Sequence, residues 1–206
     1  MRSLATILVL LTSLISVPFT NLVFADQFDD AIAAYERGDY ATAFRLMKPL
    51  AGKGDAKAQH NLGVMYDYGR GIPQDYTKAL EWYRRAADQG MPEAQHNLAL
   101  MYANGQGVPQ KYTEAAKWYR RAADQGMPVS QVNLGIMYYN GQGVSQDYIL
   151  AHMWLNLAAS QYPASVKKNL KDAVHYRDIV DSLMTPAQIA EAERLAREWK
   201  PKKEGK

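Results

Sequence analysis

Apolar residues follow two helical patterns in alternation, and the alternation recurs every 36 residues. In the first pattern, Ala58, Leu62 and Tyr66 are spaced by four, which places them on one face of a helix. In the second, Tyr76 and Tyr83 lie on a similar face, and turn-forming residues separate the two stretches. Each period therefore predicts a pair of antiparallel helices.

Comparison of the chain with itself shows how regular this pattern is. Residues 54–89 and 90–125 are identical at 23 of 36 positions, and 126–161 form a third, looser copy. A fixed period of this size indicates a repeat array, in which stacked copies bury apolar faces that one copy cannot bury alone. The markers that recur are Leu62, Leu98 and Leu134; Gly69, Gly105 and Gly141; Gly71, Gly107 and Gly143; Tyr76, Tyr112 and Tyr148; and Trp82, Trp118 and Trp154.

Polar residues and glycines predict where the helices begin and end. Asp55 and Asp75 stand where an N-cap is needed, and Gly69 is placed for a left-handed turn after the first helix. Lys111 replaces the aspartate in the second copy, so we expect a weaker cap there. Small residues recur at one position of the first helix and predict a close backbone approach: Gly63, Ala99 and Gly135.

Both ends of the array depart from the repeat. Residues 26–53 form a shortened copy with helices expected at 28–36 and 39–51.

The last helix of the third copy is apolar nearly all round, since Leu150, Met153 and Leu157 replace polar residues, and it needs a cover. We expect residues 162–200 to supply it as two helices, from about 163 to 183 and from Pro186 onward. A partner protein on that patch is the alternative. Residues 201–206 form a basic tail expected to be solvated.

The repeat pattern resembles a known family. The motif A-x-x-x-L-G-x-M-Y-x-x-G-x-G-I/V-x-x-D-Y-x-x-A-x-x-W-Y-x-x-A-A is similar to the Sel1-like repeat, a relative of the tetratricopeptide repeat, over 58–87, 94–123 and, more loosely, 130–159. The resemblance implies an all-α, right-handed α/α superhelical solenoid. It also implies protein–protein interaction, as a scaffold, adaptor or regulator, often in bacterial envelopes. Some secreted members with disulfide-bridged helix pairs are linked to penicillin binding; this chain has no cysteine, so that property does not transfer.

The N-terminus predicts export. Arg2 is followed by an uncharged, largely apolar run over residues 3–25, and Val23 and Ala25 place small residues before a plausible cut. This layout is typical of a secretory signal peptide over residues 1–25, cleaved after Ala25. The prediction is a periplasmic or secreted protein without stable membrane insertion after cleavage. An uncleaved membrane anchor is the alternative.

Charge and composition narrow the function further. The formal net charge of +3 falls short of the dense basic face that nucleic-acid binding requires, so we expect no nucleic-acid partner. No residues form a catalytic, metal or cofactor constellation; His60 and His96 share one repeat position, which Val132 fills in the third copy. The prediction is a non-catalytic protein-interaction scaffold. The alternative is a cell-wall-associated or β-lactam-binding enzyme of the cysteine-rich repeat type.

Polar residues on the first helices are the candidate partner-binding residues. By analogy with tetratricopeptide proteins, these helices line the concave surface of the solenoid. Their amides could bind the backbone of an extended peptide; alternatively, each asparagine satisfies its own neighbouring loop or helix. The candidates are Gln59, His60, Asn61, Gln95, His96, Asn97, Gln131 and Asn133.

Overall fold

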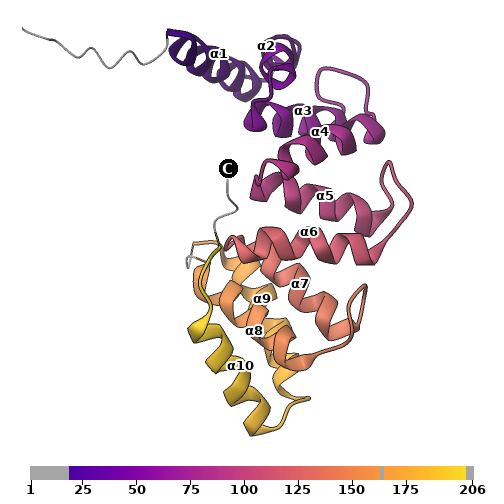
Figure 1. Cartoon of the computed structure of the whole chain (residues 1–206), viewed down its shortest axis with the longest axis vertical. Helices are drawn as coiled ribbons and strands as arrows, with labels where there is room; N and C mark the ends of the chain where they lie inside the picture. Colours follow the sequence, from indigo (N-terminus) through magenta and orange to yellow (C-terminus); the bar gives the residue numbers. More distant parts are fainter. Residues whose placement is uncertain (1–18, 163–164, 203–206) are drawn as a thin grey trace, which may run out of the picture.

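The computed structural model describes residues 19–162 and 165–202, which form ten α-helices and no strand (Figure 1). The N-terminal part contains α1 (Phe19–Glu36) and α2 (Tyr40–Gly52). The three repeats contain α3 (Ala56–Tyr68) and α4 (Tyr76–Asp88), α5 (Pro92–Asn104) and α6 (Tyr112–Asp124), and α7 (Pro128–Asn140) and α8 (Tyr148–Gln161). The C-terminal part contains α9 (Lys167–Asp181) and α10 (Pro186–Glu198).

The helices stack as a solenoid. Each first helix packs along the second helix of its own pair, and each second helix packs on the first helix of the next pair, α4 on α5 and α6 on α7. Figure 1 shows the column from α1 to α10, with the loops between first and second helices all on one side. The predicted fold class, an all-α solenoid of stacked antiparallel pairs with a C-terminal capping pair, is confirmed.

The predicted caps are present. The carboxylates of Asp55 and Asp75 accept hydrogen bonds from the backbone N–H groups of Ala58 (2.7 Å) and Lys78 (3.0 Å). Gly69 ends α3 in the left-handed region, with φ of 65°. Lys111 makes no side-chain cap, so the N-terminus of α6 lacks the bond that α4 has.

Two helix boundaries differ from prediction. Helix α1 begins at Phe19 and not at Phe28, because no glycine or proline interrupts residues 19–36 and the helix continues until the turn at Gly38. Helix α9 begins at Lys167, with Val166 before it, so it is shorter than the predicted 163–183. Residues 163–164, and residues 1–18 of the predicted signal peptide, lie outside the described part of the chain.

The chain supplies its own cover for α8. Both α9 and α10 pack against α8, and Met153 and Leu157 are each only 7% exposed. The rings of Trp154 on α8 and Trp199 after α10 meet edge to face, with centroids 6.1 Å apart. Helix α9 also contacts α7, so it takes the place that the first helix of a fourth repeat would have. The predicted capping role of this segment is confirmed.

The basic tail is attached where it begins. The backbone N–H of Lys202 donates to the carbonyl of Asp124 (2.7 Å), and its Nζ lies 3.2 Å from the carboxylate of the same residue. Lys202 is solvated as expected, with its side chain 72% exposed, but this backbone bond holds it at the end of α6. Residues 203–206 lie outside the described part.

The second glycine of each loop is a contact between repeats. Gly107 has φ of 68°, and a Cβ there would lie 2.5 Å from the carbonyl oxygen of Tyr76, the first residue of α4. Gly71 makes the same approach to Tyr40, where a Cβ would lie 2.7 Å from the carbonyl carbon, and Gly143 approaches Tyr112. Each loop thus presses on the second helix of the preceding pair, and a side chain there would separate the two.

The small residues inside the first helices have the predicted role at one position and a different role at another. A Cβ on Gly63 would lie 2.5 Å from the ring of Tyr83, and one on Gly135 would lie 2.8 Å from Cγ of Leu155. The nearest atom is therefore a side chain of the second helix in the same pair. At Gly63 the glycine makes room for a large core side chain and no backbone atom is among the nearest, whereas at Gly135 a Cβ would also lie 3.1 Å from the carbonyl oxygen of Ala151, so the predicted close backbone approach holds at Gly135 and not at Gly63.

We predict that Gly107→Ala destabilises the protein by about 2–4 kcal/mol, because the new methyl group meets backbone and the residue keeps a positive φ. Gly38→Ala is the matched control, since Gly38 has φ of 82° but nothing within 4 Å of a Cβ. The control isolates the cost of the dihedral, about 1 kcal/mol. Urea unfolding of both variants measures the difference; equal losses would show that the loop contact contributes nothing.

Candidate functional site

The three candidate glutamines lie inside the solenoid. Gln95 and Gln131 are fully buried and Gln59 nearly so. Each Nε2 donates to the carbonyl eight residues before it, at the end of the preceding pair: Ala51 (3.1 Å), Ala87 (3.2 Å) and Ala123 (3.2 Å). Each Oε1 accepts from the glutamine that ends its own pair: Gln89 (2.7 Å), Gln125 (2.8 Å) and Gln161 (3.1 Å).

These glutamines therefore join one pair to the next. Gln89 and Gln125 extend the bridge, since their Nε2 atoms also donate to the carbonyls of Gly54 and Gly90, each at 3.0 Å. A buried amide whose two ends are bonded inside the protein is not accessible to a partner. The prediction that Gln59, Gln95 and Gln131 bind a partner is therefore wrong, because these side chains are buried between the helix pairs.

The two candidate histidines link successive first helices. His96 is 8% exposed, and its Nδ1 lies 2.9 Å from Oγ of Ser130 on α7. The Nε2 of His60 lies 3.0 Å from Nδ2 of Asn97 on α5. Burial lowers the pKa of His96 to about 4 and also lowers the pKa of His60, because the charged imidazolium is poorly solvated there.

The candidate asparagines are half-buried on the first-helix face. Asn61 donates to the carbonyl of Lys57 in its own helix (2.9 Å), and Asn97 bonds to His60 as described. Asn133 lines a hollow between α7 and α9. The structure thus favours the alternative for Asn61, whose amide nitrogen bonds within its own helix, and for Asn97, whose amide nitrogen bonds to the preceding first helix. The three form a row at the surface without forming one site.

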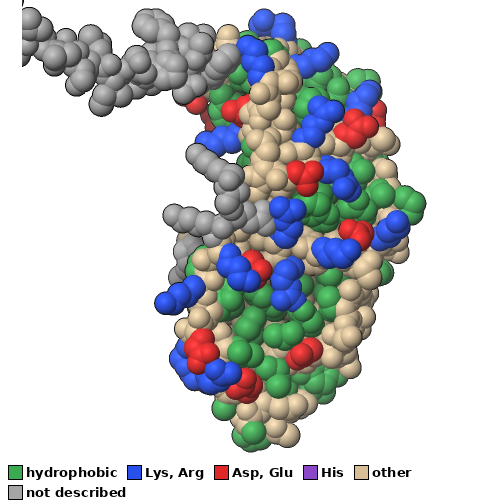
Figure 2. Space-filling view, in the orientation of Figure 1, with side chains coloured by type: hydrophobic (Ala, Val, Ile, Leu, Met, Phe, Trp, Pro, Cys, Tyr) green, Lys and Arg blue, Asp and Glu red, His purple; other side chains and the backbone are tan. Residues whose placement is uncertain are grey.

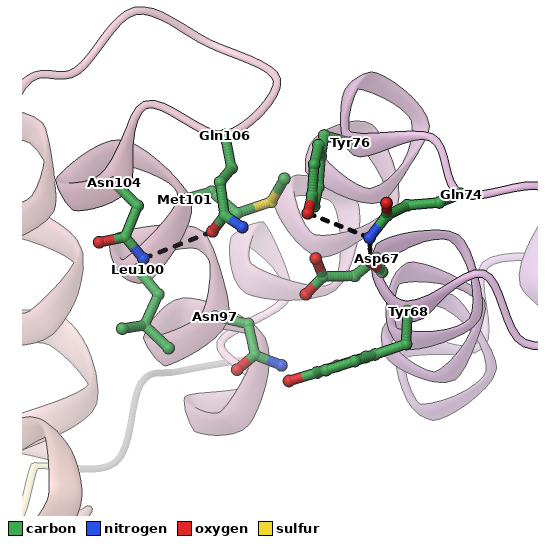
Figure 3. Close-up of a pocket in the computed structure, with 9 residues that line it drawn as sticks. All are labelled: Asp67, Tyr68, Gln74, Tyr76, Asn97, Leu100, Met101, Asn104 and Gln106. Atoms are coloured by element: carbon green, nitrogen blue, oxygen red, sulfur yellow. Dashed lines mark hydrogen bonds between the residues drawn. The ribbon is translucent and has the colours of Figure 1, made fainter.

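A pocket of about 320 Å³ opens between the first helices of two neighbouring pairs, α3 and α5 (Figure 3). In Figure 3, Asp67 and Tyr68 from the end of α3 face Asn97 and Asn104 from α5, with Tyr76 beside them. The lining residues are Asp67, Tyr68, Gln74, Tyr76, Asn97, Leu100, Met101, Asn104 and Gln106. Of these nine lining residues, only Asn97 was among the predicted partner-binding residues.

Asp67 is the charged group of this pocket. Its Oδ2 accepts a hydrogen bond from the hydroxyl of Tyr83 at 3.2 Å. Burial raises the pKa of Asp67, and this hydrogen bond opposes the rise. Burial, and then the nearby Asp67, raise the pKa of Tyr83, so that its hydroxyl stays a donor. Tyr68, next in the chain, is 65% exposed and offers an aromatic face at the surface.

The frame of the pocket repeats along the chain, whereas its chemistry does not. The Nε2 of Gln74 donates to the carbonyl of Asp67 (2.6 Å) and lies 3.0 Å from the hydroxyl of Tyr76. Gln110 and Gln146 bind the carbonyls of the matching residues in the same way, each at 2.7 Å. Those matching residues are Ala103 and Tyr139, so Asp67 is particular to the first copy.

Sequence reasoning missed Asp67 and Tyr68. The candidate residues recur from copy to copy, whereas Asp67 and Tyr68 stand out because they do not recur. The neighbouring positions recur from copy to copy, whereas Asp67 becomes Ala103 and Tyr68 becomes Asn104. Because the positions around them repeat, the change at these two positions marks Asp67 and Tyr68 as candidates for function.

A second hollow, of about 480 Å³, lies between α7 and α9. Aliphatic residues of α7, Val129, Val132 and Ile136, form one side of it. Tyrosines and mixed polar residues line the rest: Tyr162, Tyr176, Asn133, Lys168, Asn169, Asp172 and His175. The capping helix α9 thus builds a groove of its own with the last repeat.

Other features of the described residues bear on chemistry and on location. Within 19–162 and 165–202, no group of three or more histidine, aspartate or glutamate side chains is arranged to hold a metal ion. None of the helices described is long and apolar enough to cross a bilayer. On the face that Figure 2 shows, basic and acidic side chains are interspersed, with hydrophobic side chains between them.

Stacked antiparallel pairs with a double-glycine loop define an α-solenoid repeat protein. The family model for the Sel1 repeat matches residues 56–91, 92–127 and 128–163, more than half of the chain. The chain therefore belongs to the Sel1 repeat family, whose repeats form protein-interaction scaffolds.

Two solved structures are similar to this chain. A protective antigen of uropathogenic Escherichia coli strains, which displays an SLR fold, is 33% identical with a TM-score of 0.75 and aligns over 85% of this chain. The alignment spans 37% of the antigen's length. A Sel1 repeat protein from Oxalobacter formigenes is 43% identical with a TM-score of 0.54, over 61% of this chain and 95% of that one. No curated protein matches the chain.

The lowered pKa of His96 predicts acid sensitivity. Because the unfolded chain binds this proton near pH 6.5 and the folded chain near 4, stability is lost as pH falls through this window, by up to about 3 kcal/mol. The double variant His96→Val, Ser130→Ala removes this histidine and its partner. Both new residues already occur in the repeat, because Val132 stands at the position that matches 96 and Ala94 at the position that matches 130. Urea unfolding between pH 7 and pH 4 should show a smaller loss in this variant. An identical loss would contradict the assignment.

Proposed function

We propose that this protein is an exported, non-catalytic scaffold that holds a segment of a partner protein against the face of its first helices. The observation that carries the proposal is the pocket between α3 and α5, where Asp67 and Tyr68 depart from the repeat and lie at the surface. Repeat proteins use such extended faces to bind other proteins, and the family membership supports this use.

The face around the pocket has the composition of a protein interface. Val64, Leu100 and Ile136 occupy one repeat position of the three first helices and are half-buried. They run beside the row of asparagines, so aliphatic and amide groups alternate across the repeats. Partly exposed aliphatic groups with polar neighbours suit binding to a protein segment.

Export after cleavage at Ala25 agrees with the packing of α1. Ala31 and Ala34 are buried, and Phe28, Ile32 and Tyr35 pack against them. All five lie after Ala25, so a mature chain that begins at Asp26 keeps these contacts. The proposed location is the periplasm or the exterior of the cell, with the protein free of the membrane after cleavage.

A non-catalytic role agrees with the use of the polar residues. His96 and the buried glutamines are bonded between helices, and Asp67 is the one titratable carboxylate of the α3–α5 pocket. General acid–base catalysis needs a side chain positioned within hydrogen-bond reach of the reacting proton of a substrate. The alternative of a cell-wall or β-lactam enzyme draws no support from this arrangement.

Site-specific crosslinking in intact cells tests the proposal. A photo-crosslinking residue at position 104, at the rim of the pocket, should capture a discrete partner, whereas one at position 81, exposed on α4, should not. The mass of the same purified protein should correspond to a chain that begins at Asp26. Equal capture from both positions would argue against the first-helix face, and a mass that includes residues 1–25 would argue against cleavage.

A further inference from the structure

We propose that the pocket between α3 and α5 binds the cationic side chain of a lysine or arginine from the partner segment. The inference rests on the proposed function, because it assigns the chemistry of the group that enters the pocket. The observation behind it is a half-buried carboxylate, facing aromatic and amide groups, that no basic side chain of the described chain neutralises (Figure 3).

The charge of Asp67 is uncompensated. None of the nine lining residues is basic, and Asp67 is the only acidic one. Its recorded partner is the neutral hydroxyl of Tyr83, and burial outweighs that bond in setting the pKa. A partly buried carboxylate without a cation is costly relative to a paired one, so a cation that enters the pocket gains the interaction that the protein does not provide.

The remaining walls suit a cation on an apolar stem. An ammonium group needs up to three acceptors and a guanidinium five. The amide side chains of Asn97, Asn104 and Gln106 line the pocket together with the carboxylate and carry neutral acceptor oxygens, and Asn104 already donates to Gln106 at 3.4 Å. Leu100 and Met101 line the pocket as well and can contact the methylene groups of the stem.

Tyr68 adds an aromatic surface at the entrance. Tyr68 is 65% exposed, so its aromatic face is accessible to a group that enters the pocket. A cation over such a face gains about 0.5–1 kcal/mol at an exposed site. Tyr68 thus both recognises charge and covers the stem of a side chain that reaches Asp67.

The protein's own cation nearest to Tyr68 does not fill the pocket. The guanidinium of Arg70 donates to the hydroxyl of Tyr35 and lies 5.3 Å and 5.8 Å from the ring centroids of Tyr35 and Tyr40, on α1 and α2. It contacts the ring of Tyr68 at 5.2 Å but is not among the lining residues. It also has no part in setting the pKa of Asp67. Arg70 therefore fixes Tyr68 from the side of α1 and α2.

The pocket would set the register of a bound segment. At the next junction the positions of Asp67 and Tyr68 hold Ala103 and Asn104, so the same frame offers no carboxylate there. A segment lying across several repeats could place its basic residue at only one of these two junctions. One charged position within a repeating surface is sufficient to exclude shifted alignments.

Chemical-shift mapping on the protein as isolated from cells tests the assignment. The probes are lysine and arginine capped as the Nα-acetyl methylamides, with capped norleucine as the neutral match for lysine. We expect saturable shifts of the Asp67, Asn104 and Gln106 amides at millimolar lysine or arginine. Asp67→Asn should weaken binding about fivefold or more, and Tyr68→Ala about threefold. Asp88→Asn, which removes one exposed charge from the same repeat, should change nothing.

Three results would overturn the assignment. The first is that norleucine binds as tightly as lysine. The second is that Asp67→Asn binds lysine as tightly as the unaltered protein does. The third is that neither cation gives a saturable shift. If Asp67→Asn does not fold, undiminished lysine binding by Tyr68→Ala is the decisive contrary result. None of these outcomes removes the partner captured from position 104, so a failure of the charge assignment is distinguishable from a failure of the proposed function.

Discussion

The structure depends on contacts that each helix pair can make only with its neighbours. The buried amide of Gln95 joins the end of α4 to the end of α6, and Gly107 lets the following loop touch the first turn of α4. The bond from Gln95 to Ala87 and the approach of Gly107 to Tyr76 both cross from one pair to the next. Helices of 13 residues are marginal in isolation, so stacking must supply the stability that each pair lacks.

The same constraint explains where function can reside. Positions that face the neighbouring pair are fixed by the glutamine bridges, the loop glycines and links such as Arg84 to the hydroxyl of Tyr102. Positions on the open edge of the first helices are not fixed in this way. Asp67 and Tyr68 occupy that edge, so they can differ between copies without disturbing the stack. The repeated residues hold the helices together, and the residues that differ between copies, such as Asp67 and Tyr68, give the surface its binding groups.

The sequence predicted the fold well because the fold is local and repeated. Helix pairs, the Asp55 cap, the turn at Gly69 and the cover over α8 all follow from spacing within one or two periods. The start of α1 was mispredicted because nothing local ends a helix between Phe19 and Phe28. The site was harder to predict, since a glutamine that recurs on a first helix reads equally as a ligand for a peptide or as a bridge to the next pair. Only the packing shows that Gln95 is buried, and that Asp67 faces α5.

The most direct measurement is the circular dichroism of the middle pair, residues 90–125, as an isolated peptide. If stacking holds the fold, the peptide should show little helix and no cooperative thermal transition, while the full chain shows both. A folded peptide with a sharp melt would contradict the account, because it would show that one pair is stable without its neighbours.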